Sequence, residues 1–284
     1  MLSLKQISEE SHSLILDSDA GLVSLAPNEW ESQFFGRPFA LLKIDTDVAN
    51  EKHAQALKSS LESLILTSDK LGYEVLEVRL NSTQMTLLPI LEEKGFRLVD
   101  THAVFITRMR KDMVEVIQPD IAKLCFADID LKTDILNLTH KAFTFNPTFY
   151  SRFKNRLYFN NDETAKYYSA YIDNYLGNAN TLFAVAMAEN RVIGYLIYQC
   201  HGAHDNLPLY KGILVASDRE YSGNHIHFAL QSFIYRAIPH DEYYLHTTTQ
   251  LSNILTLNNY IESKKRLNKV VFILYRKYKT PSSF

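Results

Sequence analysis

Short apolar runs alternate with amphipathic segments along both halves of this 284-residue chain, and the alternation limits the folds that it can adopt. The clearest amphipathic segment is residues 50–71, where apolar side chains recur three or four positions apart, as on the buried face of a helix. The runs between such segments are short and rich in β-branched and aromatic residues, which favour strands. The pattern predicts an α/β fold in which helices pack on a mixed sheet.

Two domains are expected, residues 1–110 and residues 111–284, because a charged segment at 108–111 separates two runs of this alternation. In the first domain, Gly72 and Gly95 each end a helix. The expected strands there are 14–16, 22–25, 39–44, 73–80 and 98–108, and the expected helices are 50–71 and 83–94.

The second domain repeats the alternation, with Glu189 and Asn190 at the turn of a hairpin. Asn161 or Asp162 is expected to cap one of its helices. The expected strands are 114–117, 181–188, 191–199, 209–216, 243–248 and 270–278, with helices at 128–142, 162–176, 224–237 and 253–265.

The charge balance argues against a surface that coats nucleic acid, which requires an excess of Lys and Arg. The chain has 30 basic and 32 acidic residues, a formal charge of −2. The polar N-terminus is unlike a signal peptide, and no stretch of about 18 apolar residues could cross a membrane. The expectation is a cytoplasmic protein that binds neither nucleic acid nor membrane.

Two cysteines and two histidine pairs are the candidates for structural or metal-binding groups. Cys125 and Cys200 cannot form a disulfide framework or alone supply a zinc site, and buried reduced thiols are expected. The pairs His201/His204 and His225/His227 suggest zinc, but neither has a third ligand at a characteristic spacing. Loop histidines, and no metal, are therefore the favoured interpretation.

Several segments, in their order along the chain, carry a resemblance to a known superfamily. They are Trp30-Glu31-Ser32-Gln33-Phe34-Phe35-Gly36, Lys94-Gly95-Phe96-Arg97-Leu98-Val99-Asp100, Ser151-Arg152-Phe153 with the helix after it, and the segments 209–230 and 245–260. The chain resembles the GNAT superfamily of N-acetyltransferases, and more closely its two-domain TDP-fucosamine acetyltransferases. The resemblance implies a truncated GNAT-like N-terminal domain and a complete C-terminal GNAT domain. It also implies acetyl-CoA as cosubstrate and a small amine, such as a nucleotide-linked amino-deoxysugar, as acceptor.

The resemblance assigns binding of acetyl-CoA to a strand and to the turn after it. Backbone groups of Leu214, Val215 and Ala216 would hold pantetheine, with an N–H near Val215 for the oxyanion. The pyrophosphate would lie on the turn into the next helix, formed by Ser222, Gly223, Asn224, His225, Ile226 and His227. Ser222 replaces the superfamily's Gln or Arg, and His225 and His227 replace its two glycines. A protonated His could pair with phosphate, or the side chains could block it and leave a decayed site on a retained fold.

The resemblance assigns the catalytic step to the following helix. Asn253 would bind pantetheine, and Tyr260, seven residues later and on the same helix face, would protonate the leaving thiolate. Arg152 would contact the substrate from an aromatic and basic segment, 143–158, that could alternatively bind nucleic acid or only pack. Candidate bases by position are Glu189, Asp218, Glu220 and His204.

The sequence leaves the donor and the quaternary structure open. A longer acyl group or a carrier-protein donor would relax the demand for a pyrophosphate turn, and a binding or scaffold protein would need none. The sequence also permits a homodimer.

Overall fold

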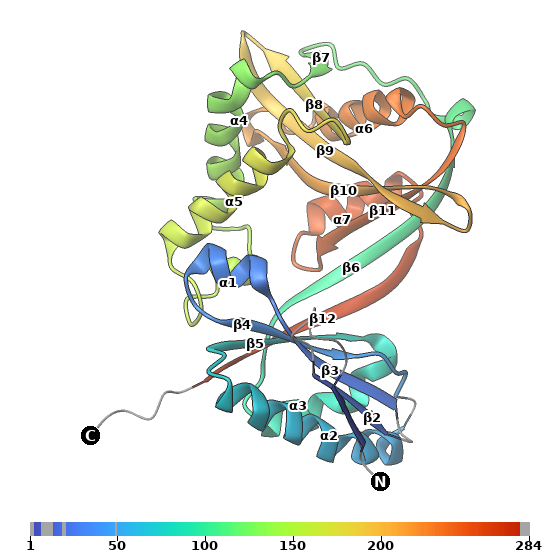
Figure 1. The fold of residues 1–284 in the computed structure, drawn as a ribbon. Helices are drawn as coiled ribbons and strands as arrows, with labels where there is room; N and C mark the ends of the chain where they lie inside the picture. The colour runs from blue at the N-terminus through green and yellow to red at the C-terminus, as the bar shows by residue number, and fades with distance from the viewer. Residues whose placement is uncertain (1–2, 7–13, 19–20, 49, 279–284) are drawn as a thin grey trace. The chain divides into compact units, whose positions relative to one another are not determined.

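A computed structural model describes residues 3–6, 14–18, 21–48 and 50–278 (Figure 1). The chain forms two compact units, one of residues 1–102 with 269–284 and the other of residues 103–268. It passes from the first unit to the second within β6 (Arg97–Arg110) and returns within β12 (Leu267–Lys277). The units differ from the expected ranges chiefly because the last strand, expected in the second domain, belongs to the first unit.

The first unit is a sheet with helices, and its neighbouring strands follow the order β1-β2-β3-β4-β5-β12. Strands β4 and β5 are parallel, whereas β12 is antiparallel to β5. The elements are β1 (Ser3–Gln6), β2 (Leu14–Ser18), β3 (Gly21–Pro27), α1 (Glu29–Phe35), β4 (Phe39–Ile44), α2 (Glu51–Lys70), β5 (Val75–Asn81), η1 (Ser82–Leu87) and α3 (Leu88–Glu93). The expected turn between β2 and β3 includes residues 19 and 20, which lie outside the described residues, as does most of the N-terminal segment 1–13.

Local signals explain most of this unit. Asn50 caps α2 through a hydrogen bond from the backbone N–H of His53, and α2 buries its apolar stripe, as predicted. The predicted helix at 83–94 is divided into η1 and α3, because Pro89 lacks an N–H and starts a new first turn. The segment Trp30–Gly36, for which the sequence predicted no helix or strand, forms α1, which is capped by Asn28 and ended by Gly36 at φ 64°.

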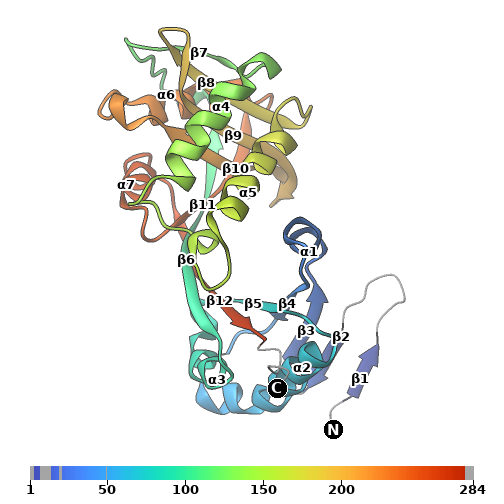
Figure 2. The same ribbon diagram turned by 90° about the vertical axis from the view of Figure 1, so that its left-hand side faces the viewer.

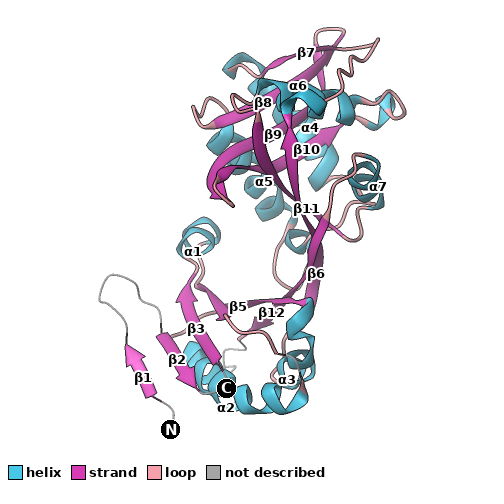
Figure 3. Cartoon of the chain, turned by 90° about the vertical axis from the view of Figure 1, so that its right-hand side faces the viewer, coloured by secondary structure: helices cyan, strands magenta, loops and turns pink. Residues whose placement is uncertain are grey.

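The second unit is a sheet with helices on both faces, with the strand order β6-β11-β10-β9-β8-β7. Figures 2 and 3, which view the molecule from opposite sides, show α4 and α5 on one face and α6 and α7 on the other. The elements are η2 (Lys111–Met113), β7 (Lys123–Phe126), η3 (Ile129–Leu131), α4 (Lys132–Thr139), a π-helical turn η4 (His140–Thr144), η5 (Arg152–Lys154), α5 (Asn161–Tyr175), β8 (Thr181–Ala188), β9 (Arg191–His204), β10 (Leu207–Ser217), η6 (Arg219–Tyr221), α6 (Ile226–Ala237), β11 (Glu242–Gln250) and α7 (Ile254–Glu262).

Two tyrosines of β9 connect the sheet to the helices on opposite faces. The hydroxyl of Tyr195 lies 2.9 Å from that of Thr139 on α4, and the hydroxyl of Tyr198 lies 2.9 Å from that of Tyr235 on α6. Side chains three positions apart on a strand point to opposite faces of the sheet, so these two tyrosines contact helices on different faces. On the face of the sheet that α6 covers, Leu230 and Ile234 of α6 are part of the hydrophobic core.

Several sequence predictions for this unit are wrong in detail. Residues 114–117 form no strand: the Ser232 hydroxyl on α6 donates to the Glu115 carbonyl (2.6 Å) and accepts from the Ile117 N–H (3.2 Å). A strand that was not predicted, β7, pairs instead with β8. Asn160, rather than Asn161 or Asp162, caps α5 in a capping box with Glu163. Among the described residues, no helix is long and apolar enough to cross a membrane.

Candidate active site

The parallel strands β10 and β11 stop pairing part-way along their length. They share three residue pairs, Leu209–Tyr244, Tyr210–Leu245 and Lys211–His246, although β10 continues to Ser217 and β11 to Gln250. Just beyond the last pair, β10 shifts its register against β9, so that Ile213 forms a bulge. The backbone of β10 beyond Lys211 therefore has an edge that is not paired with β11. Leu214, Val215 and Ala216 lie on this stretch.

The first residues beyond the last pair, Gly212 and Thr247, lie against each other. A Cβ at Gly212 would be 3.0 Å from the Thr247 methyl group and 3.3 Å from the Tyr198 ring, so a larger residue would push both away. Thr247 is 1% exposed, and its side chain lies beside Tyr260, whose pKa it acts to lower. The Thr247 side chain therefore connects the end of the paired segment of β10 and β11 with Tyr260.

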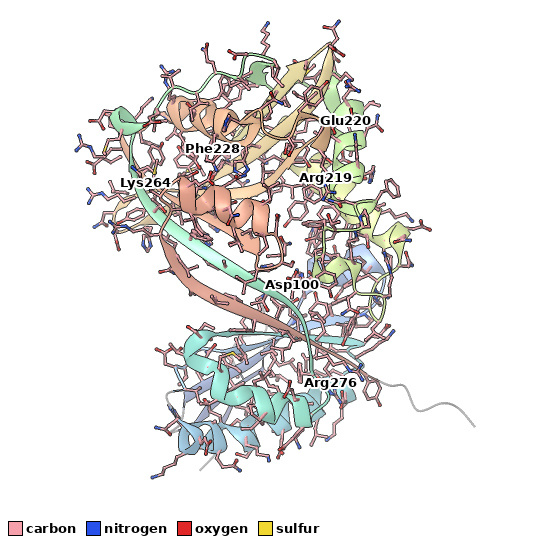
Figure 4. All side chains as sticks on the ribbon, turned by 180° about the vertical axis from the view of Figure 1, so that it is seen from behind. Asp100, Arg219, Glu220, Phe228, Lys264 and Arg276 are labelled. Atoms are coloured by element: carbon pink, nitrogen blue, oxygen red, sulfur yellow. The ribbon has the colours of Figure 1, made fainter. Side chains whose placement is uncertain are left out.

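The turn after β10 leads into the N-terminus of α6 (Figure 4). Asp218 caps η6, Gly223 has φ 86°, and His225 occupies the N-cap position of α6 with φ 53°. No side chain caps α6, so the N–H groups of its first turn stay available to an anion. Ser222, Gly223, Asn224 and Ile226 are all part of this connection.

His227 does not face the turn but lies against α7. Its Nε2 is 2.7 Å from the Gln231 side-chain nitrogen, and its Nδ1 is 3.3 Å from that of Asn259 on α7. Burial, together with the nearby Lys265, lowers the pKa of His227 to about 3. Burial therefore favours a neutral His227 ring, which connects α6 to α7 and does not favour the expected pairing of a protonated His227 with phosphate.

Tyr260 and Asn253 occupy opposite ends of one face of α7. Asn253 caps the helix through its Oδ1, which accepts from the Thr256 N–H at 3.3 Å. Tyr260 is 6% exposed and packs edge-on against Phe105 at 5.2 Å between ring centroids. Burial raises the pKa of Tyr260 above its usual range, and the nearby Thr247 opposes the shift only in part. Tyr260 is therefore protonated and can act as a proton donor.

Lys265 is the residue of this cluster that sequence reasoning missed. It is 8% exposed, with Nζ 4.0 Å from the centroid of the Tyr260 ring and 3.4 Å from the Tyr198 hydroxyl. Burial lowers its pKa to about 7. No signal in the sequence marks it, because Lys264-Lys265-Arg266 reads as an exposed basic run.

Comparison with known proteins places this geometry in a fold family. No protein-family model and no curated protein matches the sequence. The structure is similar to a functionally unknown conserved protein from Staphylococcus epidermidis (TM-score 0.63, 10% identity, 98% of this chain and 96% of the other). It is also similar to a GCN5-related N-acetyltransferase (GNAT) from Sphaerobacter thermophilus (TM-score 0.60, 12% identity, 99% and 85%). A third similar structure is a tandem GNAT protein from the clavulanic acid biosynthesis pathway, without acetyl-CoA (TM-score 0.54, 10% identity, 95% and 83%). The chain has the GNAT fold. At these identities the likeness concerns the fold alone.

The four residues expected as bases lie outside α7, which carries Tyr260. Lys141 Nζ pairs with both Asp218 and Glu220 at 2.9 Å. Burial acts to raise the pKa of Asp218, but its hydrogen bonds and the Lys141 charge prevail and lower it, so this carboxylate is a weak base. Glu189 lies in the β8–β9 turn at φ 48°, and His204 packs edge-on against Tyr244 at 4.6 Å. Among the described residues, none of the four bonds to Tyr260 or Lys265.

Arg152 and several aromatic residues of the segment 143–158 are packed inside the second unit. Arg152 is 8% exposed, and its guanidinium lies 4.6 Å from the Phe153 ring centroid. Phe153 stacks on Tyr167 at 3.8 Å, and Phe143 stacks on Tyr168 at 4.8 Å. The packing interpretation therefore holds for these aromatic residues, while Phe145 and Tyr150 of the same segment are exposed.

The cysteines and histidines form no metal site in the part of the chain that the structure describes. No group of three His, Cys, Asp or Glu side chains there could hold a metal ion. Cys125 is half-buried and Cys200 is exposed, so the expectation that both are buried is wrong. Cys200 lies on the outer end of β9, close to the exposed β9–β10 turn, where the strand is no longer covered.

Glycine substitutions at the two positions where the superfamily has glycines are expected to act in opposite directions. His225→Gly relieves a left-handed backbone and should raise the free energy of unfolding by about 0.5–1 kcal/mol, net of glycine's greater freedom when unfolded. His227→Gly places glycine inside α6 and removes the contacts to Gln231 and Asn259, so it should lower stability by about 1–3 kcal/mol. Urea unfolding of both variants tests this, and shifts of the same sign would contradict it.

Proposed function

We propose that this protein is an N-acyltransferase that moves an acetyl group from acetyl-CoA to the amine of a small substrate. The observation that carries the proposal is the end of pairing between β10 and β11 after Lys211 and His246, beside Tyr260 and the buried Thr247 hydroxyl. The extended pantetheine arm of acetyl-CoA can form hydrogen bonds with the unpaired backbone edge that this separation leaves. The GNAT fold of the chain supports the same assignment.

The residues that would hold acetyl-CoA follow from the same geometry. The β10 edge at Leu214–Ala216 would pair with the amides of pantetheine, and the Asn253 side chain would donate from the start of α7. The pyrophosphate would lie at the N-terminus of α6, where free N–H groups and the helix dipole favour an anion. The exposed His225 would contact it at the N-cap.

The reaction needs an uncharged amine, a site for the oxyanion and a proton for the departing thiolate. A backbone N–H beside the bulge, near Val215, would stabilise the negative oxygen of the tetrahedral intermediate. Tyr260, which burial keeps protonated at neutral pH, would donate its proton to sulfur as the C–S bond breaks. The amine of an amino sugar has a pKa low enough that no strong base is required to remove its proton.

A nucleotide-linked amino-deoxysugar is the acceptor that we propose. Its support is the sequence resemblance of residues 30–36 and 151–153 to the TDP-fucosamine acetyltransferases. Arg152 carries a planar, permanently charged group suited to a diphosphate. The acceptor is tested by screening amino sugars with and without a nucleoside diphosphate for release of free CoA.

A second candidate function is a binding protein with a retained GNAT fold. The contact between His227 and Asn259 favours it, because it ties α6 to α7 next to Tyr260 and places a ring where the superfamily has a glycine. In this case the protein would bind acetyl-CoA weakly or not at all.

Calorimetric titration with acetyl-CoA at low salt separates the two functions. Acetyl-CoA is expected to bind with micromolar affinity, and absence of binding at millimolar concentration would contradict the acetyltransferase proposal. The double variant H225G/H227G is the companion measurement. Binding by the variant but not by the wild type would indicate a decayed site.

A further inference from the structure

We propose that Lys265 is an internal acetyl acceptor, whose side-chain amine takes the acetyl group from acetyl-CoA bound at the site described above. The proposal rests on the proposed function, because it requires acetyl-CoA beside Tyr260. It adds to that function a modification site within the chain. The acetylated side chain would occupy the cluster and lose its ability to carry charge.

The turn after α7 reverses the chain, and the Lys265 side chain then lies against the Tyr260 ring of that helix. Lys264 has φ 55°, the Lys265 N–H donates to the Tyr260 carbonyl at 2.9 Å, and the Lys264 N–H donates to the Ile261 carbonyl at 2.9 Å. These bonds define a Schellman motif, which reverses the chain at the helix end. Figure 4 labels Lys264 at this turn, and Lys264 is less buried than its neighbour Lys265.

The Lys265 amine lies beside the place where β10 and β11 separate. Its Nζ is 3.4 Å from the hydroxyl of Tyr198, and the same end of the Tyr198 ring would be 3.3 Å from a Cβ at Gly212, the first β10 residue beyond the last pair. The same Nζ lies 4.0 Å from the centroid of the Tyr260 ring. One side chain thus connects the proposed proton donor with the strand that would hold the thioester.

The surroundings of Lys265 favour an uncharged amine. The titratable groups that face it are Tyr198 on β9, His227 and Tyr235 on α6, and Tyr260 on α7. Within the described residues no carboxylate forms an ion pair with it, and burial lowers its pKa to about 7. Near neutral pH, the uncharged fraction of this amine is larger than that of an ordinary lysine by roughly 100-fold or more. An uncharged amine is what attack on a thioester requires.

The transfer balances with the groups that are present. The Nζ lone pair attacks the thioester carbonyl carbon, a C–N bond forms, and the C–S bond breaks. Tyr260 gives its proton to the thiolate, and the proton lost from nitrogen restores the Tyr260 hydroxyl. The products are an amide on Lys265 and free CoA thiol.

Mass spectrometry of the full chain after incubation with acetyl-CoA at neutral pH tests the proposal. Cleavage after Glu262 by a glutamate-specific protease releases residues 263–284, since no Asp or Glu follows, and fragmentation of this peptide distinguishes Lys264 from Lys265. We expect acetylation of Lys265 at least about tenfold faster than of Lys264, slowed in Tyr260→Phe.

A calorimetric titration of the same sample separates the possible failures. Binding of acetyl-CoA with Lys265 unmodified, or with Lys264 modified equally fast, would overturn the acceptor role and leave the proposed function intact. Absence of binding would overturn both. Preferential acetylation that persists at the same rate in Tyr260→Phe would overturn the role of Tyr260 as proton donor in this transfer.

Discussion

A Tyr260→Phe variant is expected to transfer acetyl groups about 10²–10⁴-fold more slowly than the wild type, the range for loss of a positioned proton donor. The substitution removes one hydroxyl and retains the ring, which packs against Phe105 and under the Lys265 amine. Without the hydroxyl, the departing thiolate loses the proton donor that we propose for it. The affinity for acetyl-CoA should remain nearly unchanged, because the hydroxyl acts mainly on the charge that develops during the reaction.

Release of CoA thiol, measured with an accepted amine, checks this expectation alongside calorimetric affinity. Tyr243→Phe is a matched control, since Tyr243 is also buried and its hydroxyl donates to the Tyr235 carbonyl rather than facing the β10–β11 separation. Turnover in Tyr260→Phe equal to that of Tyr243→Phe would exclude Tyr260 as the acid and would favour the binding-protein function.

Replacing Lys265 with Met is expected to change how stability depends on pH. Burial lowers the pKa of Lys265 to about 7 in the folded protein, whereas an unfolded lysine titrates near 10.4. Between these values the unfolded chain binds more protons, so wild-type stability gains up to about 1.4 kcal/mol per pH unit from this residue as pH rises. Below pH of about 7 the full cost of burying the charge remains. Met carries no charge and keeps most of the packing against Tyr260.

Urea unfolding from pH 6 to 10 measures this difference. The Lys265→Met variant should be the more stable protein at pH 6, by several kcal/mol, and its advantage should shrink toward pH 10. Lys264→Met is the control, because Lys264 is not buried and its removal should leave the pH profile parallel to that of the wild type. A parallel profile for Lys265→Met as well would show that Lys265 is charged when folded.

The elements that the sequence predicted well are those whose signals lie within the element. Helix α2 has an apolar stripe and an Asn cap, and strand β8 has the predicted bounds. The turn between β8 and β9 has positive φ at both Glu189 and Asn190, as a two-residue hairpin turn requires. Asn253 and Tyr260 share a face of α7 because helix periodicity alone places residues seven apart together.

The predictions that failed depended on contacts with distant residues. Residues 114–117 have the composition of a strand, but Ser232 on α6 takes their backbone bonds. The strand β12 was predicted, yet its pairing with β5 was not, since strand partners are chosen by packing over the whole chain. Cys200 was expected inside because its neighbours are apolar, and it is exposed because β9 extends further than predicted.

The sequence by itself determined the α/β alternation, most helix and strand positions, and the order of segments that resembles an acetyltransferase. Periodicity and caps act over a few residues, and the local sequence records them. Only the tertiary structure decided that β10 and β11 separate after three pairs, that His227 turns toward α7 as a neutral ring, and that Lys265 is buried on Tyr260. Burial and desolvation arise from residues that are distant in sequence, so no local pattern could assign a pKa or a neighbour to these side chains.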